Sequence, residues 1–319
     1  MVQVGCEIQS CRSETAAYCQ WLEKPTKAHD IAASLSCSWL VPEPVLDCIP
    51  RDVLARLGCD DGKLRVLRDI DIVDVCAGRA RVTCWARHAQ LQAVAIDRAY
   101  GEHLDICTEE GFAIVILLVL RIKENGLMMA APQCSSWIWI NKHIHKRKRD
   151  NVVGDTSIPT VVEGNMLNQR VALLAGICSL NGVHWMIEQP GSSQFFQTAC
   201  MTSVIEKTNA KRVWTWLGAF GHPSPKPTLL YGTAPFMSAL RRSNYADSEA
   251  AGLPANVGKP TAQLKAGTHS AKLVTVVTKD DGTRKVTGSK QALQLSQVYP
   301  ACFALEVVKL GWPEKFNTT

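Results

Sequence analysis

Apolar runs alternate with helical stretches along the chain from Leu67 onward. Short runs rich in β-branched residues that stop at a turn are typical of buried strands, and longer stretches with acids first and bases last are typical of helices. We predict strands over residues 70–76, 91–96, 104–106, 127–131 and 183–187, with further strands over 213–220, 228–231 and 273–277. Helices are predicted over residues 47–57, 80–90, 109–123, 162–180 and 296–310.

This alternation predicts an α/β fold with a mostly parallel, Rossmann-like sheet flanked by helices. The change of pattern along the chain also predicts three parts. Residues 1–65 form a leader that prolines interrupt, residues 66–221 form the α/β core, and residues 222–319 form a small basic region that ends in a helix.

The composition is that of a globular chain. Its 319 residues are 46% hydrophobic and 20% charged, which excludes disordered and collagen-like proteins. The longest apolar run, residues 112–120, has nine residues, against about 20 for a membrane-spanning helix. The first residues also lack the apolar segment of a secretory signal. We therefore expect an intracellular protein, nuclear or cytoplasmic, with no membrane partner.

The thirteen cysteines are scattered along the chain, and no two of them form a C-x-x-C pair. A disulfide framework or a structural zinc site would need paired residues at regular spacings. We therefore expect no metal site, and we expect most thiols to be reduced and to pack as small hydrophobic groups.

Positive charge is concentrated in the second part of the chain. The net charge is −4 over residues 1–141 and +10 over residues 142–319, and residues 142–149 include five cationic side chains and no acid. Such a cluster attracts phosphate groups or a nuclear-import receptor. The alternative is an ordinary solvated loop.

Four chemically suggestive segments fall at the ends of predicted strands. They are residues 74–78, Asp97, residues 132–136 and residues 188–190. In parallel sheets ligands bind beyond the carboxyl ends of the strands. This coincidence predicts an active site at that edge of the sheet.

The first two segments suit a nucleotide-like ligand. Gly78 allows the backbone to approach a ligand closely, and the helix that follows favours polar or anionic groups. Asp97 is placed to accept hydrogen bonds from two ribose hydroxyls. Each residue also has an ordinary explanation, because glycine is common at strand–helix turns and Asp97 could cap a helix.

The other two segments suit covalent and acid–base chemistry. Cys134 follows a buried strand, and a field from Lys142, His143 and His145 could lower its thiol pKa into the reactive range. The alternative is a buried structural cysteine. Glu188 ends an apolar strand, where partial desolvation would raise the pKa of its carboxyl group and make it a proton donor. The alternative is a helix cap or an ion-paired loop acid.

In their order, these segments resemble the cytosine-5 DNA methyltransferase family. The resemblance rests on Asp-x-x-Ala-Gly at 74–78, an acid after the second strand, Leu-Asp-Ile at 104–106, Pro-x-Cys-Ser at 132–135 and a strand-terminal glutamate. It spans roughly residues 67–221 and implies the class I S-adenosylmethionine-dependent methyltransferase fold, with the last helix packing back on the core. Residues 222–319 contain no clear target-recognition domain.

The resemblance implies a role for each of these residues. Cys134 would attack carbon 6 of a flipped-out cytosine, and Glu188 would hold nitrogen 3, so that carbon 5 accepts a methyl group. The cofactor would be S-adenosyl-L-methionine, with its methionine end against Asp74, Ala77 and Gly78, its ribose on Asp97, its adenine beside Asp105 and Ile106, and Pro132 also in contact.

Nucleic acid is the expected partner, and DNA is favoured over RNA. The expected phosphate contacts are Lys142, Lys146, Arg147, Lys148, Arg149 and Arg212. Trp137 and Trp139 could stack on a base or pack as strand residues.

Two other functions remain open. A catalytically inactive protein with the methyltransferase fold could bind nucleic acid through the basic second part of the chain. A methyltransferase of another substrate class could share only the sheet, because a fold does not determine a function.

Overall fold

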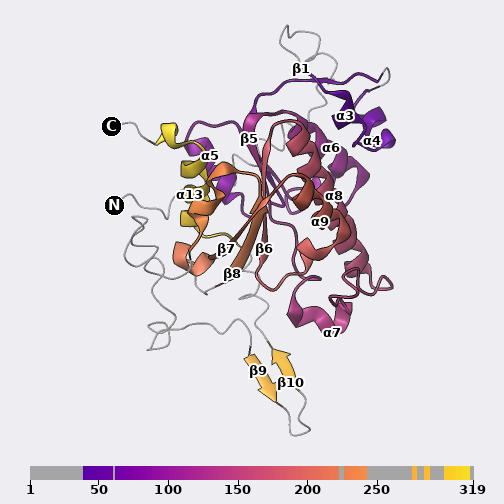
Figure 1. Cartoon of the computed structure of the whole chain (residues 1–319), viewed down its shortest axis with the longest axis vertical. Helices are drawn as coiled ribbons and strands as arrows, with labels where there is room; N and C mark the ends of the chain where they lie inside the picture. Colours follow the sequence, from indigo (N-terminus) through magenta and orange to yellow (C-terminus); the bar gives the residue numbers. More distant parts are fainter. Residues whose placement is uncertain are drawn as a thin grey trace.

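A computed structural model describes residues 39–59, 62–222, 226–242, 275–278, 284–287 and 298–316. A six-stranded sheet lies at its centre, in the order β4-β3-β5-β6-β8-β7 (Figure 1). β4, β3, β5 and β6 are parallel, whereas β8 runs antiparallel to both β6 and β7. The predicted α/β fold with a mostly parallel sheet is confirmed, and it is compatible with a Rossmann-like fold. The strands are β3 (Ile70–Val75), β4 (Ala93–Ile96), β5 (Ile122–Ala130), β6 (His184–Pro190), β7 (Lys211–Trp216) and β8 (Pro227–Gly232).

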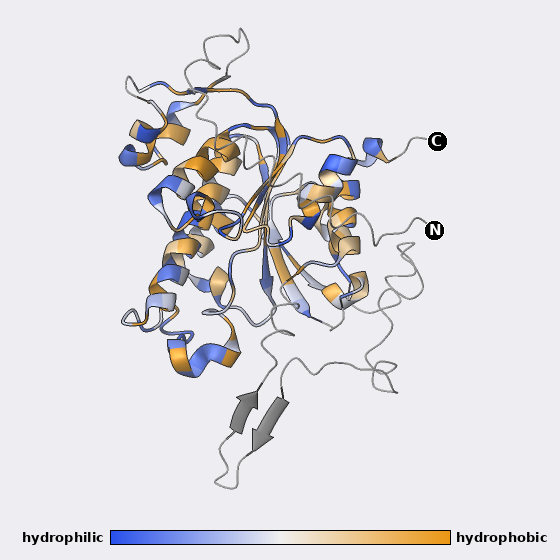
Figure 2. Ribbon diagram, turned by 180° about the vertical axis from the view of Figure 1, so that it is seen from behind, coloured by the Kyte–Doolittle hydropathy of each residue, from blue (hydrophilic) through white to orange (hydrophobic). Residues whose placement is uncertain are grey.

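Helices cover both faces of this sheet. α6 (Glu109–Leu120), α8 (Pro159–Leu180) and α9 (Ala199–Lys207) lie on one face, and α5 (Arg81–His88) and α13 (Ala301–Gly311) lie on the other (Figure 1). Because side chains alternate along a strand, Val73 and Val75 enter the core under the first group, whereas Ile72 enters the core under the second. In Figure 2 the helices beside the sheet carry both hydrophobic and hydrophilic residues, while hydrophilic residues dominate the outlying helix α7 (Lys142–His145).

The order of the strands determines where a ligand can bind. β3 pairs with β4 on one side and with β5 on the other, so the chain changes direction across the sheet after β4. The crevice beyond the carboxyl ends of the strands at such a switch point is the usual ligand site of an open parallel sheet. The ends of β3, β4 and β5 are therefore the expected ligand site in this fold.

Smaller elements connect and flank the sheet. β1 (Trp39–Leu40) pairs with β2 (Arg65–Val66), and β9 (Thr275–Thr278) pairs with β10 (Arg284–Thr287), both antiparallel. The other short elements are α3 (Glu43–Leu46), α4 (Arg51–Arg56) and the 3₁₀ helices η1 (Glu102–Leu104), η2 (Trp139–Asn141), η3 (Phe195–Gln197), η4 (Leu217–Phe220), η5 (Pro235–Leu240) and η6 (Pro313–Lys315).

The structure corrects three predicted elements in the first half of the chain. Of the helix expected over 47–57, only α4 (Arg51–Arg56) is helical, because Pro50 has no backbone N–H to continue a helix from the preceding residues, and α3 ends before this range. The strand expected over 104–106 is instead η1 followed by a turn, in which Asp105 accepts a hydrogen bond from the Cys107 backbone at 2.8 Å. The helix expected over 109–123 ends at Leu120, and Ile122 already belongs to β5.

Two further differences concern a bulge and a helix that the pattern did not predict. Asn125 and Gly126, which lie between the predicted helix 109–123 and the predicted strand 127–131, are inside β5, where Asn125 has a φ of 62° and the register with β3 shifts. α9 was not predicted, although Thr198 accepts a hydrogen bond from the Met201 N–H and caps it.

The ends of the chain are described only in part. Residues 1–38 and 60–61 of the predicted leader lie outside the described residues, as do 243–274 and 288–297 of the predicted C-terminal part. The strand predicted over 273–277 corresponds to β9, whose first predicted residues are likewise outside the described part. The last predicted helix is α13, and its Phe303 and Val307 are buried in the core between α13, α5 and the sheet.

No helix in the described residues combines the length and the apolar character that crossing a membrane requires. Eight of the cysteines described have free thiols, namely Cys48, Cys59, Cys76, Cys107, Cys134, Cys178, Cys200 and Cys302. Cys84 differs from this set, since it is disulfide-bonded.

Candidate functional site

A cavity of about 900 Å³ opens at the carboxyl edge of the sheet. Its walls come from the segments that follow β3, β4, β5 and β6, from the residues that begin β8, and from the segment before α13. All the predicted catalytic and cofactor-binding residues except Asp74 line it, namely Ala77, Gly78, Asp97, Asp105, Ile106, Pro132, Cys134 and Glu188. Side chains that are far apart in the sequence therefore share one hollow.

The turn after β3 has an unusual backbone. Cys76, Gly78 and Ala80 have φ values of 55°, 58° and 50°, in the left-handed region that side chains disfavour. The space beside the Gly78 Cα is open, so the positive φ, and not crowding, favours glycine there. A non-glycine residue in this conformation costs about 1–3 kcal/mol, and such strain is common at ligand sites.

Asp97 holds this turn against the end of β4. Its Oδ2 accepts a hydrogen bond from the Gly78 N–H at 2.9 Å, and its Oδ1 accepts one from the Ala99 N–H at 2.9 Å. Tyr100 donates its hydroxyl to the Gly78 carbonyl oxygen at 2.8 Å. Asp97 therefore closes a turn and does not cap a helix. Each of its carboxylate oxygens can accept a second hydrogen bond, and the residue lines the cavity.

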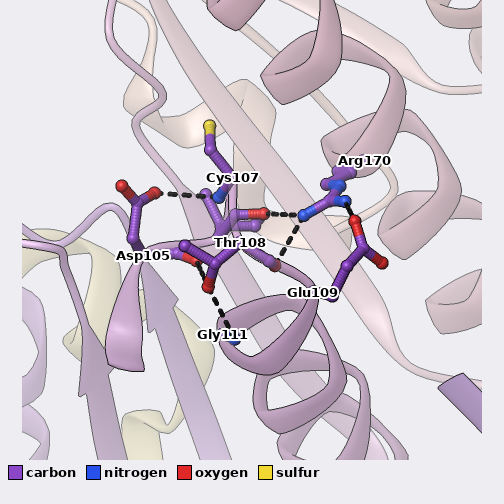
Figure 3. Close-up of polar contacts among 7 residues, drawn as sticks. Asp105, Cys107, Thr108, Glu109, Gly111 and Arg170 are labelled. Carbon is purple, nitrogen blue, oxygen red and sulfur yellow. Dashed lines mark hydrogen bonds and ion pairs between the residues drawn. The ribbon is translucent and has the colours of Figure 1, made fainter. Parts of the chain in front are cut away.

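The loop that includes Asp105 is fastened to two helices (Figure 3). Thr108 accepts a hydrogen bond from the Gly111 N–H at 3.0 Å and caps α6. Arg170, from α8, donates to the Ile106 and Thr108 carbonyl oxygens at 2.7 and 2.6 Å and pairs with Glu109. These contacts hold the Asp105–Ile106 wall of the cavity against α6 and α8, and no sequence pattern indicates this role of Arg170.

Asp74 lies behind the cavity wall and does not line it. Its side chain is fully buried, and Oδ2 accepts a hydrogen bond from the Thr83 hydroxyl at 3.3 Å. Oδ1 has no hydrogen-bond partner within the described part of the chain. Burial raises the pKa of this carboxyl group to about 7, against the hydrogen bond from Thr83.

The loop that carries Cys134 is held by two side-chain amides. Gln189, fully buried at the end of β6, donates its Nε2 to the Pro132 carbonyl oxygen at 2.6 Å. Asn141 donates its Nδ2 to the Ser135 carbonyl oxygen at 2.6 Å. Neither amide is a predicted functional residue, because an isolated glutamine or asparagine has no distinguishing pattern in the sequence.

Lys226 joins Cys134 and Glu188 in the cavity. Its Nζ lies 3.7 Å from Glu188 Oε1, and the two side chains are 13% and 7% exposed. Burial, and then the negative charge of Glu188, raise the pKa of the Cys134 thiol to about 11, whereas Lys226 lowers it. The expected lowering of this pKa by Lys142, His143 and His145 is therefore wrong, since the cation beside the thiol is Lys226.

Tyr299 closes the cavity from the C-terminal segment. Its ring centroid lies 6.0 Å from Lys226 Nζ, and Arg81 donates to its carbonyl oxygen. The buried hydroxyl has no hydrogen-bond partner among the described residues. Burial raises its pKa well above the usual value, with Glu188 and Asp74 acting in the same direction, so the hydroxyl stays protonated.

The basic cluster divides into exposed and buried members. Lys142, Lys148 and Arg149 are exposed, and Lys146 is exposed but pairs with Asp155 at 2.6 Å. Arg212 is also exposed, at the start of the edge strand β7, and does not line the cavity.

Arg147 is the exception in this cluster, because it is a core residue. It is 2% exposed, lies 3.5 Å from the Trp137 ring centroid, and donates to the Ser136 carbonyl oxygen at 2.8 Å and to Asn165 Oδ1 at 2.8 Å. Burial lowers its pKa to about 10. The predicted phosphate contact of Arg147 is wrong, since its guanidinium group faces protein carbonyls in the interior.

The two tryptophans after the cysteine have different environments. Trp137 is 1% exposed and packs edge-on against Phe195. Trp139 is 54% exposed and lines the mouth of the cavity, close in the chain to α7. Packing therefore explains Trp137, and stacking on a base remains a possible role only for Trp139.

No group of three or more His, Cys, Asp or Glu side chains in the described part of the chain could hold a metal ion. No protein-family model and no curated protein matches this chain. The geometry of the cavity is therefore the basis for any functional assignment.

Proposed function

We propose that the protein is an S-adenosylmethionine-dependent methyltransferase of the class I fold that modifies carbon 5 of cytosine in nucleic acid, with DNA as the favoured substrate. The observation that carries the proposal is one cavity that has Gly78 and Asp97 in its wall together with Cys134 and Glu188. A nucleotide-like cofactor and a base would have to meet in this way for a methyl group to pass between them.

The cavity suits an adenosine-containing cofactor in size and in chemistry. Its volume of about 900 Å³ falls within the usual range of ligand sites, roughly 300–1,000 Å³. Asp97 offers two acceptors for vicinal hydroxyls, the Gly78 turn leaves open space, and the Asp105–Ile106 wall is held by Arg170. When bound, S-adenosylmethionine supplies an electrophilic methyl group on a sulfonium, which leaves as a neutral thioether.

The residues of the chain supply the activation of cytosine. Carbon 5 is a weak nucleophile, and addition of the Cys134 thiolate to carbon 6 makes the ring an enamine. In the free protein Glu188 is a carboxylate, so the Cys134 thiol first gives up its proton, which Glu188 takes up through solvent. Glu188 delivers this proton to nitrogen 3, which neutralises the charge that the addition creates. After carbon 5 has bonded to the methyl group, carbon 5 loses its proton to solvent, nitrogen 3 returns its proton to Glu188, and the thiolate leaves as the aromatic ring is restored.

A cytosine inside a duplex must leave the stack to reach this cavity, at a cost of a few kcal/mol. The exposed cations Lys142, Lys148 and Arg149 follow the Cys134 loop and could bind phosphates beside the opened pair. Trp139 at the cavity mouth offers a stacking surface.

The test measures transfer of a labelled methyl group from S-adenosylmethionine to cytosine-containing DNA and RNA. The parent protein should label cytosine carbon 5, and Cys134→Ser should abolish labelling while retaining cofactor binding in calorimetry. Cys48→Ser, at a free thiol outside the cavity, is the matched control and should transfer at the parent rate. Equal transfer by Cys134→Ser and the parent would overturn the proposal.

A catalytically inactive nucleic-acid-binding protein is the second candidate, and one observation favours it. With a pKa of about 11, the Cys134 thiol is protonated at neutral pH in the ligand-free form. This candidate predicts strongly salt-sensitive DNA binding without cofactor binding, whereas the first predicts both. Calorimetry with S-adenosylmethionine therefore separates the two functions.

A further inference from the structure

Lys226 occupies a position that the proposed chemistry does not yet explain. It stands just before β8, and β8 runs antiparallel to β6 with Pro190 opposite Thr228, so the start of β8 lies beside the end of β6. Its ammonium group is 3.7 Å from Glu188 Oε1, an oxygen that has no hydrogen-bond donor among the described residues. Both side chains face the cavity that Cys134 also lines.

We propose that Lys226 is a positioning residue that acts through Glu188: it pairs with the carboxylate in the free protein, and when Glu188 takes up a proton from solvent to hydrogen-bond a ring nitrogen of a ligand, the charge of Lys226 is freed to stabilise the Cys134 thiolate. The ligand would be a cytosine base whose nitrogen 3 engages Glu188, and in this respect alone the inference rests on the proposed function.

The charges around the thiol support this assignment. Glu188 from β6 raises the pKa of the Cys134 thiol and Lys226 lowers it, so loss of the negative charge leaves the positive one uncompensated. Tyr299 and Cys76 also line the cavity, and burial raises the pKa of both, so they stay neutral. Arg98, on the same wall, is paired with Glu163 at 2.5 Å and with Gln133.

The remaining charged groups of the cavity follow β3 and β4 and belong to the proposed cofactor side. They are Arg79, Arg81, Asp97 and Asp105. None of them is among the charges that act on the Cys134 thiol, which are those of Glu188 and Lys226. In the proposed coupling the thiol stays protonated while Glu188 is paired with Lys226, and it becomes reactive when a ligand engages Glu188.

Iodoacetamide alkylation of the full-length protein tests this coupling without substrate or cofactor. The rate at the peptide that carries Cys134, measured by mass spectrometry from neutral to alkaline pH, reports the thiolate fraction. Glu188→Gln, which imitates the protonated acid, should raise the rate at neutral pH by about tenfold, as expected for one pKa unit, and move the profile to lower pH. Lys226→Met should lower the rate by a similar factor, and Lys226→Arg should restore it.

Lys207→Met removes an exposed cation on α9 outside the cavity and is the matched control, with an unchanged profile expected. Near-ultraviolet circular dichroism establishes that each variant is folded. Unchanged profiles for Glu188→Gln or Lys226→Met, or a shift of Lys207→Met as large as theirs, would overturn the inference. Absence of methyl transfer with the expected alkylation profiles would instead contradict the proposed function and leave the coupling intact.

Discussion

Gln189 donates its side-chain amide to the Pro132 carbonyl oxygen at 2.6 Å, and this hydrogen bond joins the end of β6 to the loop that carries Cys134. The same side chain accepts a hydrogen bond from the Ser193 hydroxyl at 2.8 Å. Glu188 precedes Gln189 directly, so one fully buried residue sets the spacing between the acid and the thiol.

Gln189→Ala should therefore disturb both stability and the site. It leaves the Pro132 carbonyl oxygen and the Ser193 hydroxyl without their partner, at a cost of about 1–3 kcal/mol in the free energy of unfolding. Urea denaturation measures this loss, and methyl transfer should fall more than the folded fraction does. Gln92→Ala, at an exposed glutamine before β4, is the matched control and should change neither quantity. Parent-like stability of Gln189→Ala would show that the hydrogen bond does not brace the loop.

Neighbouring cations of the basic cluster should give opposite phenotypes. Arg147→Met removes the donors of the Ser136 and Val152 carbonyl oxygens and should destabilise the fold by about 2–3 kcal/mol or more. Lys148→Met should leave the melting temperature unchanged, because the Lys148 side chain is exposed. It should weaken DNA binding and reduce the slope of the salt dependence by about one, as expected for the loss of one phosphate contact. Thermal denaturation and salt titrations of DNA affinity measure the two effects. If Arg147→Met melted like the parent, its buried hydrogen bonds would be unimportant.

The fold and the location of the site were predictable because they depend on local pattern. Buried strands such as β3 and β6 show as short apolar runs, and the carboxyl ends of parallel strands meet at one edge. Cys134 follows β5 and Glu188 lies near the end of β6, so their convergence on one cavity could be expected from their positions alone.

Residues that depend on long-range pairing were not predictable. Lys226 reaches Glu188 only because β8 returns antiparallel beside β6, and nothing in its neighbourhood in the sequence indicates that pairing. Arg147 looks like any other cation of its cluster, and only the tertiary structure shows that its guanidinium group is buried on Trp137. The strand predicted over 104–106 is likewise replaced by a 3₁₀ helix that ends at Leu104. A run of three residues is too short for its apolar pattern to distinguish a strand from a helical turn.

Asp74 should make folding depend on pH. Its pKa rises from 3.8 to about 7 in the folded protein, mainly through burial, so the folded state holds a proton that the unfolded chain releases. This contribution to stability is complete below the unfolded pKa and is lost as the pH rises through about 7. The side chain of Asp74→Asn stays neutral, so the free energy of unfolding of this variant relative to that of the parent should increase with pH. One pKa unit corresponds to about 1.4 kcal/mol, so the increase should be a few kcal/mol at most.

Urea denaturation across this pH range measures the effect. Asp150→Asn, at an exposed carboxyl group, is the control and should follow the pH dependence of the parent. A constant difference in stability between Asp74→Asn and the parent at all pH values would mean that Asp74 is not protonated in the folded protein.

Tyr299→Phe should separate stability from ligand binding. A buried hydroxyl without a partner is a desolvation cost, so its removal should stabilise the ligand-free protein, by about 1 kcal/mol. The ring remains to pack against Phe303, whose centroid lies 5.3 Å away, while the ligand in the cavity loses a donor. We expect a higher melting temperature together with weaker cofactor or cytosine binding in calorimetry.

Tyr231→Phe is the matched control, because Tyr231 lies on β8 beside Phe196 and does not line the cavity. It should leave ligand affinity at the parent value. If Tyr299→Phe bound both ligands as tightly as the parent, the Tyr299 hydroxyl would make no hydrogen bond to either ligand. The C-terminal segment would then close the cavity by packing alone.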